Sequence, residues 1–390
     1  MDQEESTKDP LKERLKSLSP EDLQKGLRLF QERLHHEYAV YLNSCVRCGL
    51  CLDSCHYYLA DQEVKSVPAY KLDCVARLFR KNFTLLGKMM PRWVRAEDFD
   101  TALAEEWLDC LFGRCTLCGR CSINCTMGIN IAYLIRTARG VLAELGLVPP
   151  GLQSTVDTAL HRGNSMGIPR EDWMETVEWL EEELQVEVGD SEARIPLDQK
   201  RAEILYTVNP REPMFFPLSL LAAAKIFYAA GQSWTLSSEN YDVTNYGLYS
   251  GDDRAAGNMA ARLLQSVKTL EAQRLVLAEC GHGFNANRWE ASEWLGQKYG
   301  VSVRSILQVV AEYIHEGRIR LDPSRNPKVT TLHDPCNLVR LGGIVNEHQT
   351  RLLAVCRDDT QQRREFLLRR RRRAAGDDAF CFEADPCWSD

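Results

Sequence analysis

The chain has 390 residues, which is long enough for two or three domains that each have their own core. Its formal net charge of -7 and its pI near 5.7 exclude the overall basic field of a nucleic-acid-binding protein, so no nucleic-acid partner is expected. Fifteen cysteines would suggest disulfides in a secreted protein, but residues 1–10 are charged and contain no apolar signal segment. We therefore expect no signal peptide and a cytoplasmic location.

Residues 213–230 are the best candidate for a membrane span. This stretch is only about as long as a minimal span and it contains Lys225, so we expect a buried strand and helix there. The sequence predicts no transmembrane helix, and any attachment to the inner membrane is expected through partner subunits.

Residues 1–34 are predicted to form a helical extension, because apolar residues recur at steps of three or four among charged ones. Ser19 is the expected cap of one helix, with Pro20 in its first turn. Such a helix can dock a partner, but amphipathic helices usually cover a core, and we favour packing on its own domain.

Eight cysteines form two copies of one pattern, C-x2-C-x2-C-x3-C, in residues 45–55 and 115–125. Three thiolates of such a loop bind one 4Fe-4S cluster, and the fourth binds the neighbouring cluster in two-cluster ferredoxins. The spacing therefore predicts two 4Fe-4S clusters with exchanged fourth ligands. We assign Cys45, Cys48, Cys51 and Cys125 to the first cluster, and Cys115, Cys118, Cys121 and Cys55 to the second.

Zinc and disulfides are the alternative uses of these cysteines, but four-cysteine zinc sites usually contain two separated C-x2-C pairs. Gly49 and Gly119 hold the same place in both loops, where a residue without a Cβ lets the backbone approach the cluster. His56 and Thr126 stand where bacterial ferredoxins usually have proline after the fourth cysteine. No G-x-G-x-x-G fingerprint follows a strand, so no flavin or NAD is predicted in this chain.

The expected fold class is a mainly α-helical two-cluster ferredoxin-like domain followed by an α/β cysteine-rich domain. Residues 35–150 make up the first domain, since the segments around and between the cysteine loops have helix-period apolar positions. Residues 151–200 form a helical acidic connector, and residues 201–356 alternate short apolar runs with helical stretches such as residues 254–270 and 305–315. The expected strands lie in residues 201–210, 273–280 and 327–335.

Function is expected in the loops at the ends of these strands. Two such loops, residues 279–283 and 333–338, contain the remaining candidate site residues: Cys280, His282, His333 and Cys336.

These residues, in this order, resemble the heterodisulfide reductase family, in particular the DsrK-type subunits related to HdrD, HmcF and TmcB. In those proteins a helical two-cluster domain precedes a cysteine-rich "CCG" domain. The resemblance covers roughly residues 35–355. It rests on both cysteine loops and on four shorter motifs, in residues 125–131, 244–252, 279–282 and 333–336.

The resemblance implies a third, special iron-sulfur cluster in the C-terminal domain, which cleaves a disulfide-like bond. Cys280 and Cys336 would be its ligands, and His282 or His333 a nearby hydrogen-bond or proton donor. It also implies the partners: a quinone-linked cytochrome b-type membrane subunit, other redox subunits, and a DsrC-like thiol/disulfide protein of sulfur metabolism, as in sulfate reduction.

The sequence departs from that family after residue 336, because the expected Cys-Cys-Gly segment is absent and five arginines occupy residues 369–373. Residues 357–390 are therefore expected to be either a solvated, disordered tail or the product of truncated or frameshifted coding. Cys381 and Cys387 do not match the family's ligands, so the third cluster can be incomplete. Cys74, Cys110 and Cys356 are expected to be buried, inert thiols.

The predicted function is a cytoplasmic electron-transfer subunit that passes electrons from a quinol-linked membrane partner to a disulfide or trisulfide. One alternative is the iron-sulfur subunit of a glycolate, lactate or glycerol-3-phosphate dehydrogenase, which would require a separate flavoprotein. The other is a non-catalytic electron carrier or docking subunit.

Overall fold

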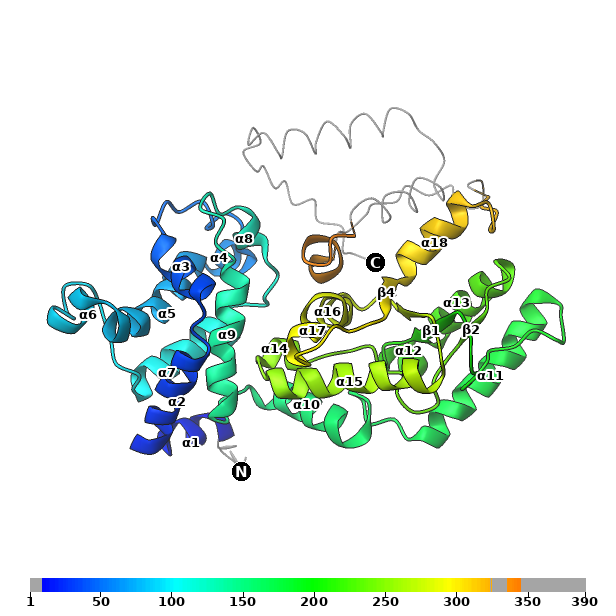
Figure 1. Cartoon of the computed structure of the whole chain (residues 1–390), viewed down its shortest axis with the longest axis horizontal. Helices are drawn as coiled ribbons and strands as arrows, with labels where there is room; N and C mark the ends of the chain where they lie inside the picture. The colour runs from blue at the N-terminus through cyan, green and yellow to red at the C-terminus, as the bar shows by residue number, and fades with distance from the viewer. Residues whose placement is uncertain (1–8, 323, 325–334, 345–390) are drawn as a thin grey trace, which may run out of the picture.

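The computed structural model describes residues 9–322, 324 and 335–344. The N-terminal helices gather at one end of the molecule, and a small sheet with its covering helices forms the other end (Figure 1). The first group consists of α1 (Pro10–Lys16), α2 (Pro20–Glu32), α3 (His36–Ser44), α4 (His56–Asp61), the 3-10 turn η1 (Val64–Ser66), α5 (Pro68–Phe83), α6 (Leu85–Met89), α7 (Thr101–Trp107), the π-helical turn η2 (Leu108–Gly113), α8 (Arg120–Ile123) and α9 (Ile131–Glu144).

The first helices of the chain pack on the same core as the helices around the cysteine loops. Ser19 caps α2 in a capping box with Asp22, and Pro20 occupies the first turn, as predicted. Leu15 and Phe30 are buried in this core, where the ring of Phe30 lies 6.0 Å from the ring of Trp107. Residues 10–32 therefore cover the helical core with their apolar side chains.

The second group contains the sheet. Its elements are α10 (Pro150–Arg162), α11 (Arg170–Val188), β1 (Ile204–Thr207), α12 (Arg211–Phe215), α13 (Pro217–Ala229), β2 (Trp234–Thr235), α14 (Gly247–Ser250), α15 (Asp253–Thr269), β3 (Arg274–Leu277), α16 (Gly281–Asn285), the π-helical turn η3 (Ala286–Glu290), α17 (Ala291–Trp294), β4 (Ser302–Ser305), α18 (Ile306–His315) and the π-helical turn η5 (Cys336–Arg340).

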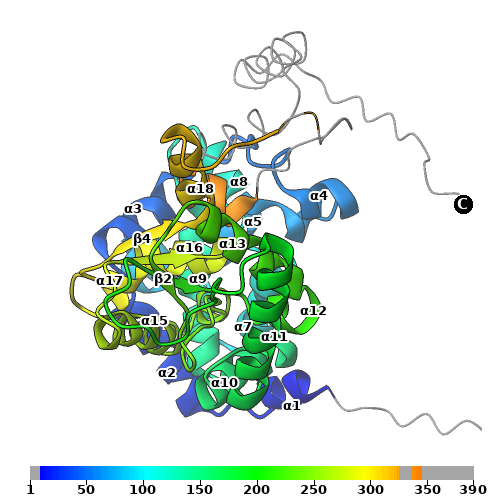
Figure 2. The same ribbon diagram turned by 90° about the vertical axis from the view of Figure 1, so that its right-hand side faces the viewer.

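The four strands are parallel and ordered β2-β1-β3-β4. In the register, Leu205 pairs with Thr235 on one side and with Leu275 on the other. Every residue of β1 is buried, as expected for a parallel strand covered on both faces. Ile204 and Tyr206 belong to the core under α11 and α13, whereas Leu205 belongs to the core under α15 and α17, in keeping with the two-residue period of a strand (Figure 2).

The expected strands in residues 201–210 and 273–280 are β1 and β3. Most of the third expected strand, residues 327–335, lies outside the described residues, as do His333, Cys356 and the tail of residues 357–390. The structure also contains β2 and β4, which were not expected.

Residues 213–230 do not contain the predicted strand. They form most of α12 and all of α13, separated by Phe216, and Phe215 and Phe216 are exposed. Pro217 explains the break, because proline has no backbone N–H to continue a helix and occupies the first turn of the next one. Among the residues described, no helix is both long enough and apolar enough to cross a membrane.

The two ends of the molecule meet where α9 passes α14. A Cβ on Gly140 would lie 2.8 Å from the Gly251 carbonyl oxygen, and a Cβ on Gly251 would lie 2.5 Å from the Gly140 nitrogen. Only residues without a Cβ allow this approach, and Gly251 also has a positive φ of 79°. The backbone contact fixes the helical part against the sheet-bearing part, whereas the predicted domain boundaries stay predictions.

Candidate functional site

The eight cysteines of the two loops line two separate cavities. The first is lined by Cys45, Cys48, Cys51 and Cys125, and the second by Cys55, Cys115, Cys118 and Cys121. The grouping is the one expected from exchanged fourth cysteines, and ligation of iron by these sulfurs stays a prediction.

The two loops have the same backbone geometry. Arg47 and Leu117, each directly before the second cysteine, have φ of 54° and 55°. The glycines after that cysteine, Gly49 and Gly119, have φ of 82° and 71°. Left-handed conformations are costly for residues other than glycine and collect at functional sites, so the repeated strain indicates that both loops are shaped around a bound group.

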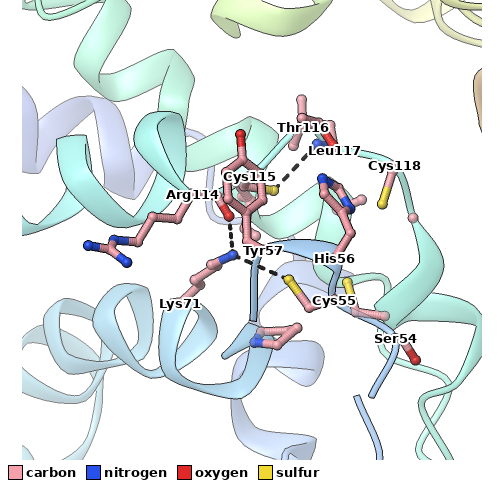
Figure 3. Close-up of a pocket in the computed structure, with 15 residues that line it drawn as sticks. Ser54, Cys55, His56, Tyr57, Lys71, Arg114, Cys115, Thr116, Leu117 and Cys118 are labelled. Carbon is pink, nitrogen blue, oxygen red and sulfur yellow. Dashed lines mark hydrogen bonds between the residues drawn. The ribbon is translucent and has the colours of Figure 1, made fainter. Parts of the chain in front are cut away.

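The second cavity contains a buried lysine (Figure 3). Lys71 is 1% exposed, and its Nζ donates to the Arg114 carbonyl oxygen and lies 3.8 Å from Cys55 Sγ. Its ammonium also lies 5.5 Å from the centre of the Tyr57 ring. A fixed positive charge at this position suits a cavity in which anionic thiolates collect.

The thiols in the cavities differ in how readily they ionise. Burial, and then the neighbouring cysteines, raise the pKa of Cys121 to about 12. Burial raises the pKa of Cys51, whereas the backbone N–H of Leu50 lowers the pKa of Cys48. Crowded sulfurs of this kind become thiolates when a metal neutralises their charge, and four cysteine sulfurs are the usual donor set of a 4Fe-4S cluster. The residues present therefore fit two such clusters.

Arg139 joins the second cavity to the sheet-bearing part. It is 3% exposed and donates to three backbone carbonyl oxygens: from Nε to Leu111 (3.0 Å), from Nη2 to Cys115 (2.5 Å) and from Nη1 to Tyr249 (2.6 Å). One guanidinium thus fixes a cysteine loop against α14.

The η5 turn adds a second connection. Arg340 Nη1 donates to the Cys118 carbonyl oxygen at 3.3 Å, and Leu341 fills the space that a Gly119 Cβ would occupy. The second cavity is therefore the one next to the segment that contains Cys336.

Cys280 and His282 lie where β3 leads into α16. Cys280 is 3% exposed, and its Sγ lies 3.4 Å from His282 Nδ1. The His282 ring lies between two tyrosines, with centroid distances of 4.9 Å to Tyr246 and 5.1 Å to Tyr249.

Cys336 is brought to the same place by η5, which packs on α16. Asn337 connects it to Tyr249, because its Nδ2 donates to the Tyr249 hydroxyl oxygen at 2.8 Å and lies 3.5 Å from Cys336 Sγ. A Cβ on Gly281 would lie 3.0 Å from the Leu338 nitrogen, so the segments carrying the two cysteines are in close contact. Tyr249 therefore lies between the second cysteine cavity and the site of Cys280 and Cys336.

The titratable groups here are shifted by burial. Burial raises the pKa of Cys280 to about 12 and lowers that of His282 to about 4, with Arg211 adding to the second effect. His282 is therefore neutral near pH 7 and can donate one N–H, and its role as a hydrogen-bond or proton donor stays a prediction. Burial raises the pKa of Glu212 to about 7, so this carboxyl is better suited to exchanging protons near neutrality.

Of the predicted residues, the structure brings together Cys280, His282 and Cys336, while His333 lies outside the described residues. Sequence reasoning missed Lys71, Arg139, Tyr249, Asn337 and Glu212. Arg139 is the only charged residue among the buried residues of α9, Tyr249 belongs to the motif in residues 244–252 and Asn337 to the loop in residues 333–338, so these three left a trace in the sequence. Lys71 did not stand out, because the buried residues of α5 also include Asp73 and Arg77.

Cys74 and Cys110 are fully buried, as expected, and form a compact group with Glu106 whose ligand atoms lie within 4.8 Å of one another. The Glu106 carboxylate already accepts from Arg77 Nη1 at 2.8 Å and from the Tyr70 hydroxyl at 2.5 Å. Because its oxygens are engaged and a guanidinium lies beside them, this group is a buried hydrogen-bond network rather than a metal centre.

Comparison with known proteins supports the cysteine loops directly. Residues 41–129 match the family described as the 4Fe-4S dicluster domain. The chain therefore has an iron-sulfur domain, in agreement with the prediction. No solved structure matches the chain at a significant level.

Among curated proteins, the chain is similar to the Hdr-like menaquinol oxidoreductase iron-sulfur subunit of Archaeoglobus profundus, with 28% identity covering 82% of this chain and 64% of that protein. It is 26% identical to the Hdr-like menaquinol oxidoreductase iron-sulfur subunit 2 of Archaeoglobus fulgidus, over 80% of this chain and 63% of that protein. It is 23% identical to a subunit of the dihydromethanophenazine:CoB--CoM heterodisulfide reductase of Methanosarcina mazei, over 78% of this chain and 70% of that protein.

These relatives confirm the resemblance to heterodisulfide-reductase-type iron-sulfur subunits that the sequence motifs predicted. The chain spans less than two thirds of the length of the two Archaeoglobus proteins.

Proposed function

We propose that this chain is an iron-sulfur electron-transfer subunit of a membrane-associated redox complex, which carries electrons from a quinol-linked cytochrome b-type partner toward a disulfide or trisulfide. The relatives described as menaquinol oxidoreductase and heterodisulfide reductase subunits support this class of reaction. The finer assignment, to a DsrK-type subunit with a DsrC-like protein substrate in sulfur metabolism, rests on the sequence motifs.

The observation that carries the proposal is the contact between the second cysteine cavity and the Cys280–Cys336 site. Arg139 holds the Cys115 loop to Tyr249, and Arg340 holds the Cys118 loop to η5. A subunit that only stored electrons would not need its cavity joined by two arginines to a second pair of cysteines.

The cysteines of the first cavity would hold one 4Fe-4S cluster and those of the second cavity the other, with Cys280 and Cys336 as two ligands of a third. When bound, such clusters supply one-electron oxidation and reduction. Oxidation of one quinol releases two electrons and two protons, and reduction of one disulfide to two thiols consumes two of each, so the overall exchange balances.

The remaining residues of the site position its sulfurs and move protons. Asn337 orients Cys336 Sγ and is itself held by the Tyr249 hydroxyl. His282 contacts Cys280 Sγ as a neutral ring. Glu212 is the candidate group for supplying a proton to a leaving thiolate, because its charge acts on Cys280 and burial raises its own pKa to about 7.

The test uses the full chain, purified and reconstituted without oxygen, reduced with dithionite, separated from the remaining dithionite and then mixed with an excess of a small trisulfide. We expect oxidation of the chain and release of free thiol in wild-type protein, and loss of thiol release in Cys280→Ser and Cys336→Ser. Cys381→Ser, a cysteine outside the predicted ligand sets, is the matched control and should keep the wild-type yield. Equal thiol release by all four proteins would disprove a role for the two cysteines.

A second candidate is a non-catalytic electron carrier or docking subunit. It is favoured by one observation: within the described part of the chain, Cys280 and Cys336 are the only cysteines at the sheet-bearing site. This candidate predicts normal reduction of the two-cluster domain, no thiol release, and unchanged electron transfer to an external acceptor in Cys280→Ser.

A further inference from the structure

Residues 83–95, here called the α6 arm, expose a dense group of large apolar side chains. Leu85 and Trp93 are each 73% exposed, and Met89 is 70% exposed. The other exposed members are Phe83, Leu86 and Met90. Figure 1 shows α6 at the edge of the helical part, on the side away from the sheet.

The arm is held in place by its own hydrogen bonds, so the exposure is not a frayed end. Thr84 Oγ1 accepts from the Gly87 nitrogen at 3.0 Å, and a Cβ on Gly87 would collide with the Arg80 carbonyl oxygen. Arg80 Nη2 donates to the Arg95 carbonyl oxygen at 3.1 Å, which ties the far end of the arm to α5. The apolar side chains are therefore presented to the outside by a defined fold.

The arm is also basic, although the chain as a whole has a net charge of -7. Residues 83–95 contain Lys88, Arg92 and Arg95 and no acidic residue. Lys88 and Arg92 are exposed, and the structure gives neither an ion pair in the described part of the chain. Cations thus alternate with apolar side chains along one short projection.

We propose that the α6 arm binds directly to an anionic membrane surface. Exposed Leu, Met and Trp side chains can enter the boundary between headgroups and acyl chains, and tryptophan favours that depth. Lysine and arginine next to them are attracted by anionic headgroups.

A second exposed apolar group gives a comparison within the same molecule. Phe215, Phe216 and Leu218 are 59%, 64% and 63% exposed, but the same segment contains both Arg211 and Glu212. It matches the arm in apolar character and lacks the excess of positive charge, so it is a control for non-specific hydrophobic binding.

The inference does not depend on the proposed reaction, because it concerns where the chain binds and not what it reduces. Failure of lipid binding would leave the trisulfide assay unaffected, and failure of that assay would leave lipid binding unaffected.

The experiment is flotation of the full chain with vesicles of phosphatidylcholine alone or mixed with phosphatidylglycerol, at low and high salt. We expect binding to the mixed vesicles that weakens with salt. The charge variant Lys88→Glu/Arg92→Glu should lose at least about tenfold in affinity, since two charge reversals remove several favourable headgroup contacts. The apolar variant Leu85→Ser/Met89→Ser/Trp93→Ser should also lose binding.

The control variant Phe215→Ser/Phe216→Ser/Leu218→Ser should bind as wild type does. Because all substituted side chains are exposed, circular dichroism and iron content should be unchanged in every variant. Absence of binding to mixed vesicles, or equal binding by the arm variants, would overturn the proposal. Binding that appears only when vesicles contain a transmembrane partner subunit would overturn it in favour of a protein docking surface.

Discussion

Lys71 is the side chain that most distinguishes the second cavity from the first. Its buried ammonium lies 3.8 Å from Cys55 Sγ, whereas the cation that lines the first cavity, Arg47, is 64% exposed and paired with Asp73. A buried charge acts through less solvent than an exposed one, so the second cavity is the more electropositive of the two. An added electron is therefore better stabilised next to the sheet-bearing part.

Lys71→Met should lower the reduction potential of the cluster held in the second cavity and leave the other almost unchanged. Two unit charges about 4 Å apart interact by about 4 kcal/mol at an effective dielectric constant of 20, and the effect is a fraction of this because the electron is shared over the cluster. Redox titration monitored by EPR measures both potentials. Lys65→Met, which removes a half-exposed lysine outside the cavity, is the control and should shift neither potential appreciably.

Asp242 gives a pH dependence that can be isolated. Burial raises its pKa to about 6, and its two oxygens accept from the Ser165 and Thr244 nitrogens at 2.6 Å each. Since the folded pKa lies above the unfolded value of 3.8, the stabilisation by the protonated form is complete below about pH 4. It is lost as the pH rises through about 6.

The free energy of unfolding of wild type minus that of Asp242→Asn should therefore fall by up to about 3 kcal/mol between pH 4 and pH 7. Urea unfolding of both proteins at several pH values measures this difference. A difference that does not change with pH would show that Asp242 has an ordinary pKa.

The site residues that were predicted from the sequence belong to short motifs, whereas those that were missed are defined by contacts between distant parts of the chain. Each cysteine loop is a local motif, and its spacing, together with the exchange of fourth ligands in two-cluster ferredoxins, predicted how the cysteines group by cavity. The residues that were missed contact partners far away in the sequence. Lys71 lies 16 residues from Cys55. Tyr249 lies 110 residues from Arg139 and 88 residues from Asn337. Such contacts depend on helix packing, which the order of residues does not show.

At the scale of elements, the crossing of α9 and α14 connects the cysteine cavities to the sheet-bearing part. Gly251→Ala places a methyl group against backbone atoms of Gly140 and Arg136 and forces a left-handed φ on alanine. The left-handed conformation costs about 1–2 kcal/mol, and overpacking typically adds about 1–3 kcal/mol.

Gly163→Ala is the matched control, because Gly163 also has a positive φ, of 84°, but no atom lies within 4 Å of the position that a Cβ would take there. Thermal or urea unfolding should therefore show a clearly larger loss of stability for Gly251→Ala than for Gly163→Ala. Equal losses would mean that α9 and α14 do not need the close approach.

Helices could be predicted from the sequence where the periodic pattern of apolar residues extends over a long stretch. The helices in residues 254–270 and 305–315 were expected from apolar periodicity and are α15 and α18. The two-residue strand β2 is too short for a period. The buried strand expected within residues 213–230 is not formed, and Phe215 and Phe216, whose residue type favours strands, are exposed. Short elements are decided by their neighbours and not by their own residues.

At the scale of the whole molecule, three features are arranged in order from one end of the molecule to the other. The α6 arm lies at one edge, the two cysteine cavities lie in the helical part, and the Cys280–Cys336 site lies in the sheet-bearing part (Figure 1). Such an order suits a chain that takes electrons at a membrane and delivers them to sulfur chemistry on the far side. The fold class was expected in outline, but the arginine contacts that join the two parts were not.

The central claim is that the two cavities hold two 4Fe-4S clusters, and the most direct test is iron and acid-labile sulfide per chain after anaerobic reconstitution, combined with EPR of the reduced protein. The account predicts at least about eight irons and eight sulfides, with two interacting reduced-cluster signals. Cys121→Ser should remove one signal and leave the other. Bound zinc in place of iron, or about four irons with one isolated signal, would contradict it.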